Sequence, residues 1–190
     1  KHNITGLLVG VLRENKSGGA SSIQTSLPAR NIGLSGRFTN AYDGRYFAEA
    51  NFGYNGSERF AKNERFGLFP SIGAGWMISE EKFWNQDLKN IINKLKLKGT
   101  YGLVGNDNIG AWNDRFFYMS EVNLNGSGAN FSWGQDFERN VGTIDMIRYR
   151  NDKIKWEIAQ KMNLGLEVGL FNIFDIQFDY FTEYRKNIFG

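Results

Sequence analysis

Apolar and polar residues alternate along the stretch from Tyr46 to Gly56. One set of alternate positions is apolar, namely Tyr46, Ala48, Ala50, Phe52 and Tyr54, and the other set contains Glu49, Asn51 and Asn55. This period of two is typical of a strand with one apolar and one polar face. The run also approaches the roughly 9–11 residues that a tilted strand needs to cross a membrane. A second run of this kind, Leu68–Ile78, follows a polar loop.

The same alternation recurs along most of the chain. It predicts seven long strands: Asn3–Arg13, Asn31–Tyr42, Tyr46–Gly56, Phe66–Ile78, Leu95–Gly105, Lys155–Leu170 and Ile176–Tyr184. Two further stretches with local β character are Phe116–Leu124 and Ala129–Phe137. Asp43-Gly44 predicts a tight hairpin turn, because such a turn needs positive φ angles.

One segment breaks this rhythm, at about residues 80–93. Trp84, Leu88 and Ile91 recur there at helical spacing, and the preceding Ser79 can cap a helix. We therefore expect one short amphipathic helix in an otherwise all-β chain, packed against the end of the sheet.

The connections between the predicted strands alternate between short and long. Short turns on one side and long loops on the other are typical of an antiparallel up-and-down transmembrane β-meander. In a barrel the apolar positions would face lipid, with Tyr42, Tyr46, Tyr101 and Tyr180 contributing to aromatic girdles. The polar positions would face a wet lumen: Arg37, Glu49, Lys96, Lys98, Lys161, Glu167, Asp179 and Glu183.

Composition agrees with long strands and excludes several classes of protein. Of 190 residues 23 are Gly, only 2 are Pro, and 15% are aromatic, as suits an all-β protein. A net charge of +3 with no Lys/Arg cluster argues against a nucleic-acid partner. The absence of Cys excludes disulfides and thiol nucleophiles. Because its first residues fit a strand better than a signal peptide, we expect the chain to begin within a longer polypeptide.

Little in the sequence points to catalysis. The single His is His2, at the chain start, and Glu80-Glu81 are explained by favourable charge at the start of a helix. The segment GNDNIG at 105–110 lacks both the P-loop Lys and the spacing of an EF-hand. We therefore expect no enzyme activity, no cofactor and no metal site.

Substrate contacts are expected in the long aromatic, Asn-rich stretch after Gly105. Aromatic rings beside amides and carboxylates suit sugar rings or peptides, whereas the alternative role is packing against neighbouring loops or a lid protein. The candidate residues are Asp107, Asn108, Trp112, Phe117, Tyr118 and Trp133.

Five ordered motifs resemble the SusC/RagA family of TonB-linked outer-membrane transporters of Bacteroidetes-type bacteria. They cover nearly the whole chain and read YDGRYFAEANFGYNGSERF, RFGLFPSIGAGWMISEEKFW, LKLKGTYGLVGNDNIG, KWEIAQKMNLGLEVGLF and FDYFTEYRKNIF. The resemblance implies that residues 1–190 belong to the β-barrel domain, of about 22 strands with a plugged lumen. They would form roughly a third of it, from its later strands, without the plug domain or the N-terminal segment that contacts TonB.

The resemblance also implies the function and the partners. It implies import of glycans or peptides across the outer membrane, powered through TonB, with substrate handed over by a SusD-like surface lipoprotein. Seven strands cannot close such a barrel, so other segments of the same protein would have to satisfy the two open edges.

A second hypothesis remains open from the residues themselves. The chain could form a soluble β-sandwich module that binds carbohydrate through the aromatic loop. In a sandwich the apolar positions pack inward, whereas in a barrel they meet lipid.

Overall fold

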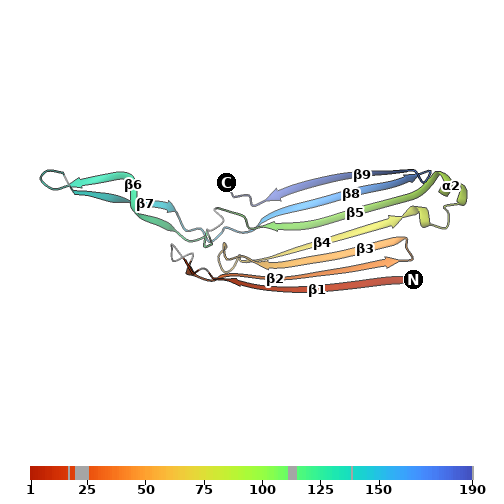
Figure 1. The fold of residues 1–190 in the computed structure, drawn as a ribbon, viewed down its shortest axis with the longest axis horizontal. Coiled ribbons are helices and arrows are strands. Elements are labelled where there is room, and N and C mark those ends of the chain that lie inside the picture. The colour runs from red at the N-terminus through yellow and green to blue at the C-terminus, as the bar shows by residue number, and fades with distance from the viewer. Residues whose placement is uncertain (17, 20–25, 111–114, 138, 190) are drawn as a thin grey trace.

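The computed structural model describes residues 1–16, 18–19, 26–110, 115–137 and 139–189. Its strands are β1 (His2–Asn15), β2 (Ala29–Tyr42), β3 (Tyr46–Gly56), β4 (Phe66–Met77), β5 (Ile92–Asn106), β6 (Glu121–Trp133), β7 (Arg139–Arg148), β8 (Glu157–Leu170) and β9 (Phe174–Lys186). Seven of them form one antiparallel sheet in the order β1-β2-β3-β4-β5-β8-β9, and β6 and β7 form a separate hairpin (Figure 1). The seven long strands and their up-and-down order are as the alternation predicted.

The two ends of the sheet differ. One end carries the short turns after β2 and β8, together with the helical segments η1 (Ile78–Glu80) and α2 (Gln86–Ile91). The other end carries the long connections, and the β6–β7 hairpin projects from it beyond the sheet (Figure 1). Neither helical segment in the described ranges has the length and apolar character needed to span a bilayer.

The register gives the sheet one apolar and one polar face. Phe38 pairs with Ala50, Ala50 with Ile72, and Ile72 with Tyr101, so these apolar side chains share a face across four strands. That face is widely accessible: Leu8 is 68% exposed, Ile72 63% and Phe178 69%. An accessible apolar surface of this extent requires a partner or a lipid environment.

Two groups of aromatic rings lie near the ends of the apolar face. His2, Tyr42, Tyr46 and Trp76 form a row at the turn end with ring centroids 4.5, 6.2 and 6.5 Å apart, and Tyr54 lies 5.2 Å from Phe66 at the loop end. Tyr46 and Tyr54 lie eight residue steps apart on β3, about 27 Å along the strand. For strands tilted by about 35–45° from a barrel axis, this separation corresponds to about 20 Å along the axis. That is close to the height of the apolar band of a membrane barrel. The girdle positions of Tyr101 and Tyr180 stay a prediction.

Hydrophobic burial among the described residues is confined to the loop end. A small cluster there consists of Phe60, Ile109, Phe117, Ile154 and Trp156. Trp156 is its centre, with its ring centroid 5.3 Å from Phe60 and 5.1 Å from Phe69, and its indole N–H donates to the carbonyl of Arg65 at 3.2 Å. This cluster anchors the long connections to the end of the sheet.

The helix is shorter than the predicted 80–93. Asn85 caps α2, because its side chain accepts the amide N–H of Leu88 at 3.0 Å, whereas Ser79 is buried and makes no cap bond. The helix ends before residue 93 because Ile92 already pairs with Leu170 of β8. Ile92 and the residues after it therefore belong to β5.

Both local β stretches predicted after Gly105 overlap a single strand. The strand β6 takes the end of Phe116–Leu124 and the beginning of Ala129–Phe137, while Phe116 and Phe117 precede it. Its partner β7, which pairs with it from Glu121–Arg148 to Trp133–Arg139, was not among the predicted strands. Pairing between the two strands, and not local residue preference, decided their limits.

The carboxylate of Glu81 joins the turn end of β3 and β4. It accepts the Tyr46 hydroxyl at 2.5 Å, the Trp76 indole N–H at 3.0 Å and Arg45 Nη1 at 3.0 Å. The Tyr46 bond, then the Trp76 bond, holds the pKa of Glu81 below its ordinary value. The ionised carboxylate is therefore the form that this cluster stabilises.

We expect the β2–β3 turn to depend on Gly44. Asp43 and Gly44 have φ angles of 54° and 70°, the two positive values of a type I′ turn. Gly44→Val should destabilise the folded protein by about 1–2 kcal/mol, because an L side chain is strained there. Gly10→Val is the matched control, since a Cβ at Gly10 meets no atom within 4 Å. Urea unfolding midpoints measure both changes, and an equal effect of the two would contradict the turn assignment.

We expect Glu81→Gln to lower the thermal unfolding midpoint at neutral pH. A carboxylate with a depressed folded pKa adds stability above its unfolded pKa, and this contribution is lost as the pH falls through the folded pKa. The gap between the wild-type and variant midpoints should therefore shrink on acidification. A gap that stays constant from neutral to acid pH would show that the charge of Glu81 is not responsible.

Candidate functional site

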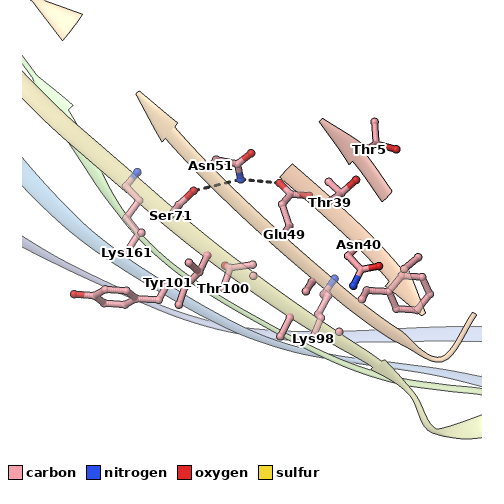
Figure 2. Close-up of a pocket in the computed structure, with 18 of the residues that line it drawn as sticks. Thr5, Thr39, Asn40, Glu49, Asn51, Ser71, Lys98, Thr100, Tyr101 and Lys161 are labelled. Carbon is pink, nitrogen blue, oxygen red and sulfur yellow. Dashed lines mark hydrogen bonds between the residues drawn. The ribbon is translucent and has the colours of Figure 1, made fainter. Parts of the chain in front are cut away.

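The polar face of the sheet carries a connected set of side chains. Arg37 Nη2 on β2 lies 2.7 Å from Glu49 Oε2 on β3. Asn51 donates to Glu49 at 2.7 Å and reaches the hydroxyl of Ser71 on β4 at 3.4 Å (Figure 2). These side chains link three neighbouring strands across the face.

Ion pairs continue this pattern over the other strands. Lys98 on β5 lies 3.3 Å from Glu167 on β8 and 3.4 Å from Asp179 on β9, and Lys94 lies 2.8 Å from Glu167. Lys161 lies 3.4 Å from Glu183. These side chains form two groups on one face, one on β2, β3 and β4 and the other on β5, β8 and β9, and we call the two groups together the polar ladder.

A hollow of about 580 Å³ opens on this face. Gly73, Gly75 and Gly102 help to make room, because they place no side chain on the polar side of β4 and β5. Hydroxyls, amides and both signs of charge line the hollow, and Figure 2 shows Thr39, Thr100 and Lys98 around it. Such a surface offers many weak hydrogen bonds and no reactive centre.

The charges of the polar ladder contribute more to the hydration of this face than to the stability of the fold. Its ion pairs are partly exposed, so each contributes little and is screened by salt. Paired charges of both signs keep the face hydrophilic without a strong field of one sign. Lys96 adds a cation 5.3 Å from the ring centroid of Phe47.

Two predicted site residues, Asp107 and Asn108, are held by an arginine of another loop. Arg59 Nη1 donates to the carbonyls of Asp107 and Ile109, both at 3.0 Å, and to Asn108 Oδ1 at 3.4 Å. Ile109 belongs to the buried cluster. This arrangement fixes the backbone of the segment and leaves the side chain of Asn108 exposed.

Two further predicted residues, Phe117 and Tyr118, lie against this anchored end. Phe117 is 7% exposed, with the Arg148 guanidinium 4.3 Å from its ring centroid and the Phe189 ring at 5.2 Å. The carbonyl of Tyr118 accepts the amide of Asn151 at 3.0 Å. In the structure Phe117 packs, which is the alternative role that the sequence left open.

The last two predicted residues do not join them. Trp133 is 62% exposed at the far end of the β6–β7 pairing, opposite Arg139, and Trp112 lies outside the described residues. The structure thus brings Asp107, Asn108, Phe117 and Tyr118 to one end of the sheet and places Trp133 at the hairpin tip. A substrate role for these six residues stays a prediction.

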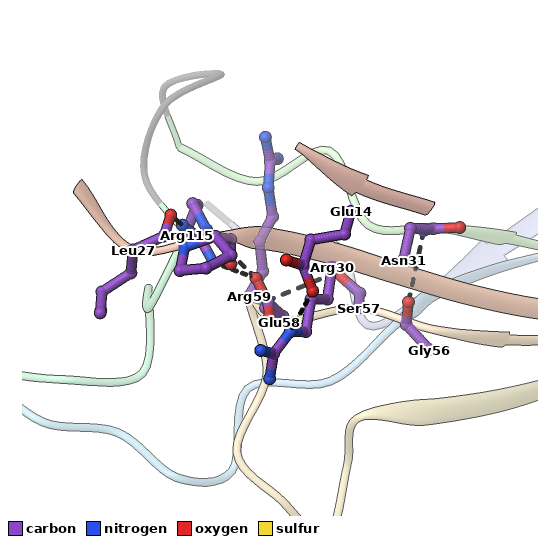
Figure 3. Close-up of polar contacts among 10 residues, drawn as sticks. Glu14, Leu27, Arg30, Asn31, Gly56, Ser57, Glu58, Arg59 and Arg115 are labelled. Atoms are coloured by element: carbon purple, nitrogen blue, oxygen red, sulfur yellow. Dashed lines mark hydrogen bonds and ion pairs between the residues drawn. The ribbon is translucent and has the colours of Figure 1, made fainter. Parts of the chain in front are cut away.

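Sequence reasoning missed the arginine that joins three loops. Arg115 forms an ion pair with Glu58 and donates to the carbonyls of Leu27 at 2.5 Å and Pro28 at 2.6 Å (Figure 3). Its partners lie 57 to 88 residues away, so local sequence patterns carry no signal for these bonds. Among the described residues, no group of three or more His, Asp or Glu is placed to hold a metal ion.

Sequence comparison relates the chain to curated receptors, although no family model matches it. It is 32% identical over 151 residues to the TonB-dependent receptor SusC of Bacteroides thetaiotaomicron, covering 78% of the chain and 14% of that protein. It is 28% identical over 172 residues to the TonB-dependent receptor P3 of Formosa agariphila, covering 88% of the chain and 16% of that protein. The chain therefore spans about a seventh to a sixth of the length of these relatives.

Comparison of structures finds solved transporter structures with a similar sheet. The RagAB peptide importer in its closed-closed state aligns over 97% of the chain and 22% of its own, with a TM-score of 0.70 and 21% identity. A second RagAB peptide transporter structure aligns over 97% with a TM-score of 0.69 and 20% identity. This confirms the antiparallel sheet as part of a receptor barrel. Sequence and fold together show that the chain belongs to the SusC/RagA type of TonB-dependent receptors, a family of outer-membrane transporters and not of enzymes.

Proposed function

We propose that residues 1–190 form neighbouring strands in the wall of one β-barrel domain, with the polar ladder lining the route of the substrate. The observation that carries this proposal is the polar ladder itself, which runs across six strands on the face opposite the accessible apolar side chains. A barrel wall needs one wet and one lipid-facing side. A β-sandwich needs a second sheet to cover the apolar face, and the described hairpin β6–β7 extends away from it (Figure 1).

The proposal fixes the orientation of the chain in the membrane. Short turns face the periplasm in such barrels and long loops face outward. The Asp43–Arg45 turn, η1 and α2 are then periplasmic, and the loop end with the β6–β7 hairpin is extracellular. Strands of other segments of the receptor complete the edges of β1 and β9, because open edges in lipid leave backbone groups unsatisfied.

The proposed cargo of the whole receptor is a glycan or a peptide. The RagAB structures are of a peptide importer, and the hydroxyls, amides and mixed charges of the polar face suit both classes. A SusD-like surface lipoprotein would deliver the cargo to the loop end, where Asp107, Asn108, Trp112, Phe117, Tyr118 and Trp133 are the candidate contacts. Energy would come through TonB, which engages the receptor as a whole.

Adjacent cysteines on β4 test which face is wet. Residues 1–190 contain no Cys, and Ser71 and Ile72 lie on opposite faces of β4. In the complete receptor in its outer membrane, Ser71→Cys should react with a water-soluble maleimide and Ile72→Cys should not. A bulky adduct at position 71 should slow uptake several-fold, because it narrows the route. Equal labelling at both positions, or labelling of Ser71→Cys without any effect on uptake, would contradict the proposal.

A further inference from the structure

The hollow on the polar face has a strip of bare backbone along β4. Gly73 lies between Glu49 of β3 and Thr100 of β5, and Gly75 is the next residue of β4 on the same face. Side chains of β3 and β5 therefore stand on either side of a strip that carries none, and Figure 2 shows Glu49 and Thr100 there. The strip leaves room for a flat molecule to lie along β4.

One side of this strip carries an aromatic ring. Phe47 is half-buried on the polar face, and it pairs with Gly75. A Cβ at Gly75 would lie 3.5 Å from Cβ and 3.6 Å from Cδ2 of Phe47, so the ring borders the bare backbone directly. The face of an aromatic ring carries partial negative charge and attracts the C–H groups of a sugar ring. Phe47 therefore offers a platform for a pyranose.

Among the described residues, four charged side chains line the hollow, and three of them have a partner of opposite charge. These three pairings are Glu49 with Arg37, Lys161 with Glu183, and Lys98 with Glu167 and Asp179. The fourth is Lys96, which forms no ion pair with any described residue. The hollow therefore has one cation in excess.

The unbalanced Lys96 is turned toward the aromatic ring. Its Nζ lies 5.3 Å from the ring centroid of Phe47, and its Cε would lie 3.7 Å from a Cβ at Gly75. Glu167 is the residue opposite Lys96 on β8, but its two carboxylate oxygens are already bound by other lysines at 2.8 and 3.3 Å. A lysine ammonium has three N–H donors, so Lys96 can bind an anion above the strip.

The other side chains that line the hollow on this face are mostly hydroxyls and amides. They are Asn3, Thr5, Thr39, Asn51, Ser71 and Thr100. Such groups both donate and accept hydrogen bonds, as the hydroxyls of a sugar do. Ile72 and Tyr101 also border the hollow, but their side chains belong to the opposite face. The hollow therefore suits a glycan better than the apolar side chains of a peptide.

We propose that this strip binds an acidic glycan, with the ring of a uronic acid unit against Phe47 and its carboxylate on the ammonium of Lys96. The 5.3 Å between ring centroid and ammonium favours a carboxylate attached directly to the stacked sugar ring. The site rests on the proposed function, because it requires the polar face to line the route of the substrate. It narrows the cargo from glycans or peptides to glycans that carry carboxylates.

The test measures binding to the complete receptor in nanodiscs by titration calorimetry. The probes are tetrasaccharides of galacturonate, glucuronate and mannuronate, each beside its methyl ester, which keeps the sugar and removes the charge. At least one uronate should bind, and more tightly than its ester. Lys96→Gln should weaken that binding about tenfold, as expected for the loss of a charge-assisted hydrogen bond, and should leave the ester unchanged. Phe47→Ala should weaken both.

Lys89→Gln is the matched control, because Lys89 of α2 pairs with Glu80 at 3.4 Å and does not line the hollow. The proposal is overturned if none of the three uronates binds, if acid and ester bind equally, or if Lys96→Gln leaves the affinity unchanged. Binding of a triglutamate peptide that depends on Lys96, with no binding of any uronate, would overturn it in favour of acidic peptides.

The maleimide experiment on β4 separates this proposal from the one on which it rests. If Ser71→Cys is labelled and slows uptake while Lys96→Gln leaves uronate binding unchanged, the polar face lines the route and only the acidic-glycan site is wrong. If Ser71→Cys is not labelled, both proposals are wrong.

Discussion

Consecutive side chains of a β-strand point to opposite faces, and the whole chain depends on this constraint. Because seven strands keep one register, every second residue joins a common apolar face and the others join a common polar face. The backbone groups are satisfied by the neighbouring strands, so the sheet does not need a core beneath it to pair. What it needs is two different surroundings, lipid on one side and water on the other.

Among the described residues, the buried hydrophobic side chains lie where the sheet meets its long loops. The cluster around Trp156 and the arginines Arg59 and Arg115 hold together connections that are far apart in sequence. This anchored end presents the exposed hairpin β6–β7 and the segment at Asp107–Asn108 from a rigid base. The turn end is held differently, by the ionised Glu81 between Tyr46, Trp76 and Arg45. The two ends are therefore held by different interactions, aromatic packing and arginine bonds at the loop end and an ionised carboxylate at the turn end.

The sequence predicts the strands because each carries its own period of two, and it predicts the β2–β3 turn because Asp43-Gly44 accepts positive φ angles. The short turn between Lys155–Leu170 and Ile176–Tyr184 is predicted too, although Phe171 and Asn172 adopt positive φ angles there without a glycine. The limits of α2 and β6 were missed because pairing with distant strands decides them. For the same reason the site could be predicted as a polar face, but the bonds of Arg59 and Arg115 could not.

The most direct measurement is a nitroxide scan along β4, from Leu68 to Trp76, in the complete receptor reconstituted in lipid vesicles. Collision rates with oxygen, which concentrates in lipid, and with a water-soluble nickel chelate are recorded at each position. Oxygen maxima are expected at Leu68, Pro70, Ile72, Ala74 and Trp76, and nickel maxima at Ser71, Gly73 and Gly75. Maxima that coincide for both reagents, or nickel access at Ile72, would contradict a sheet with one lipid-facing and one wet side.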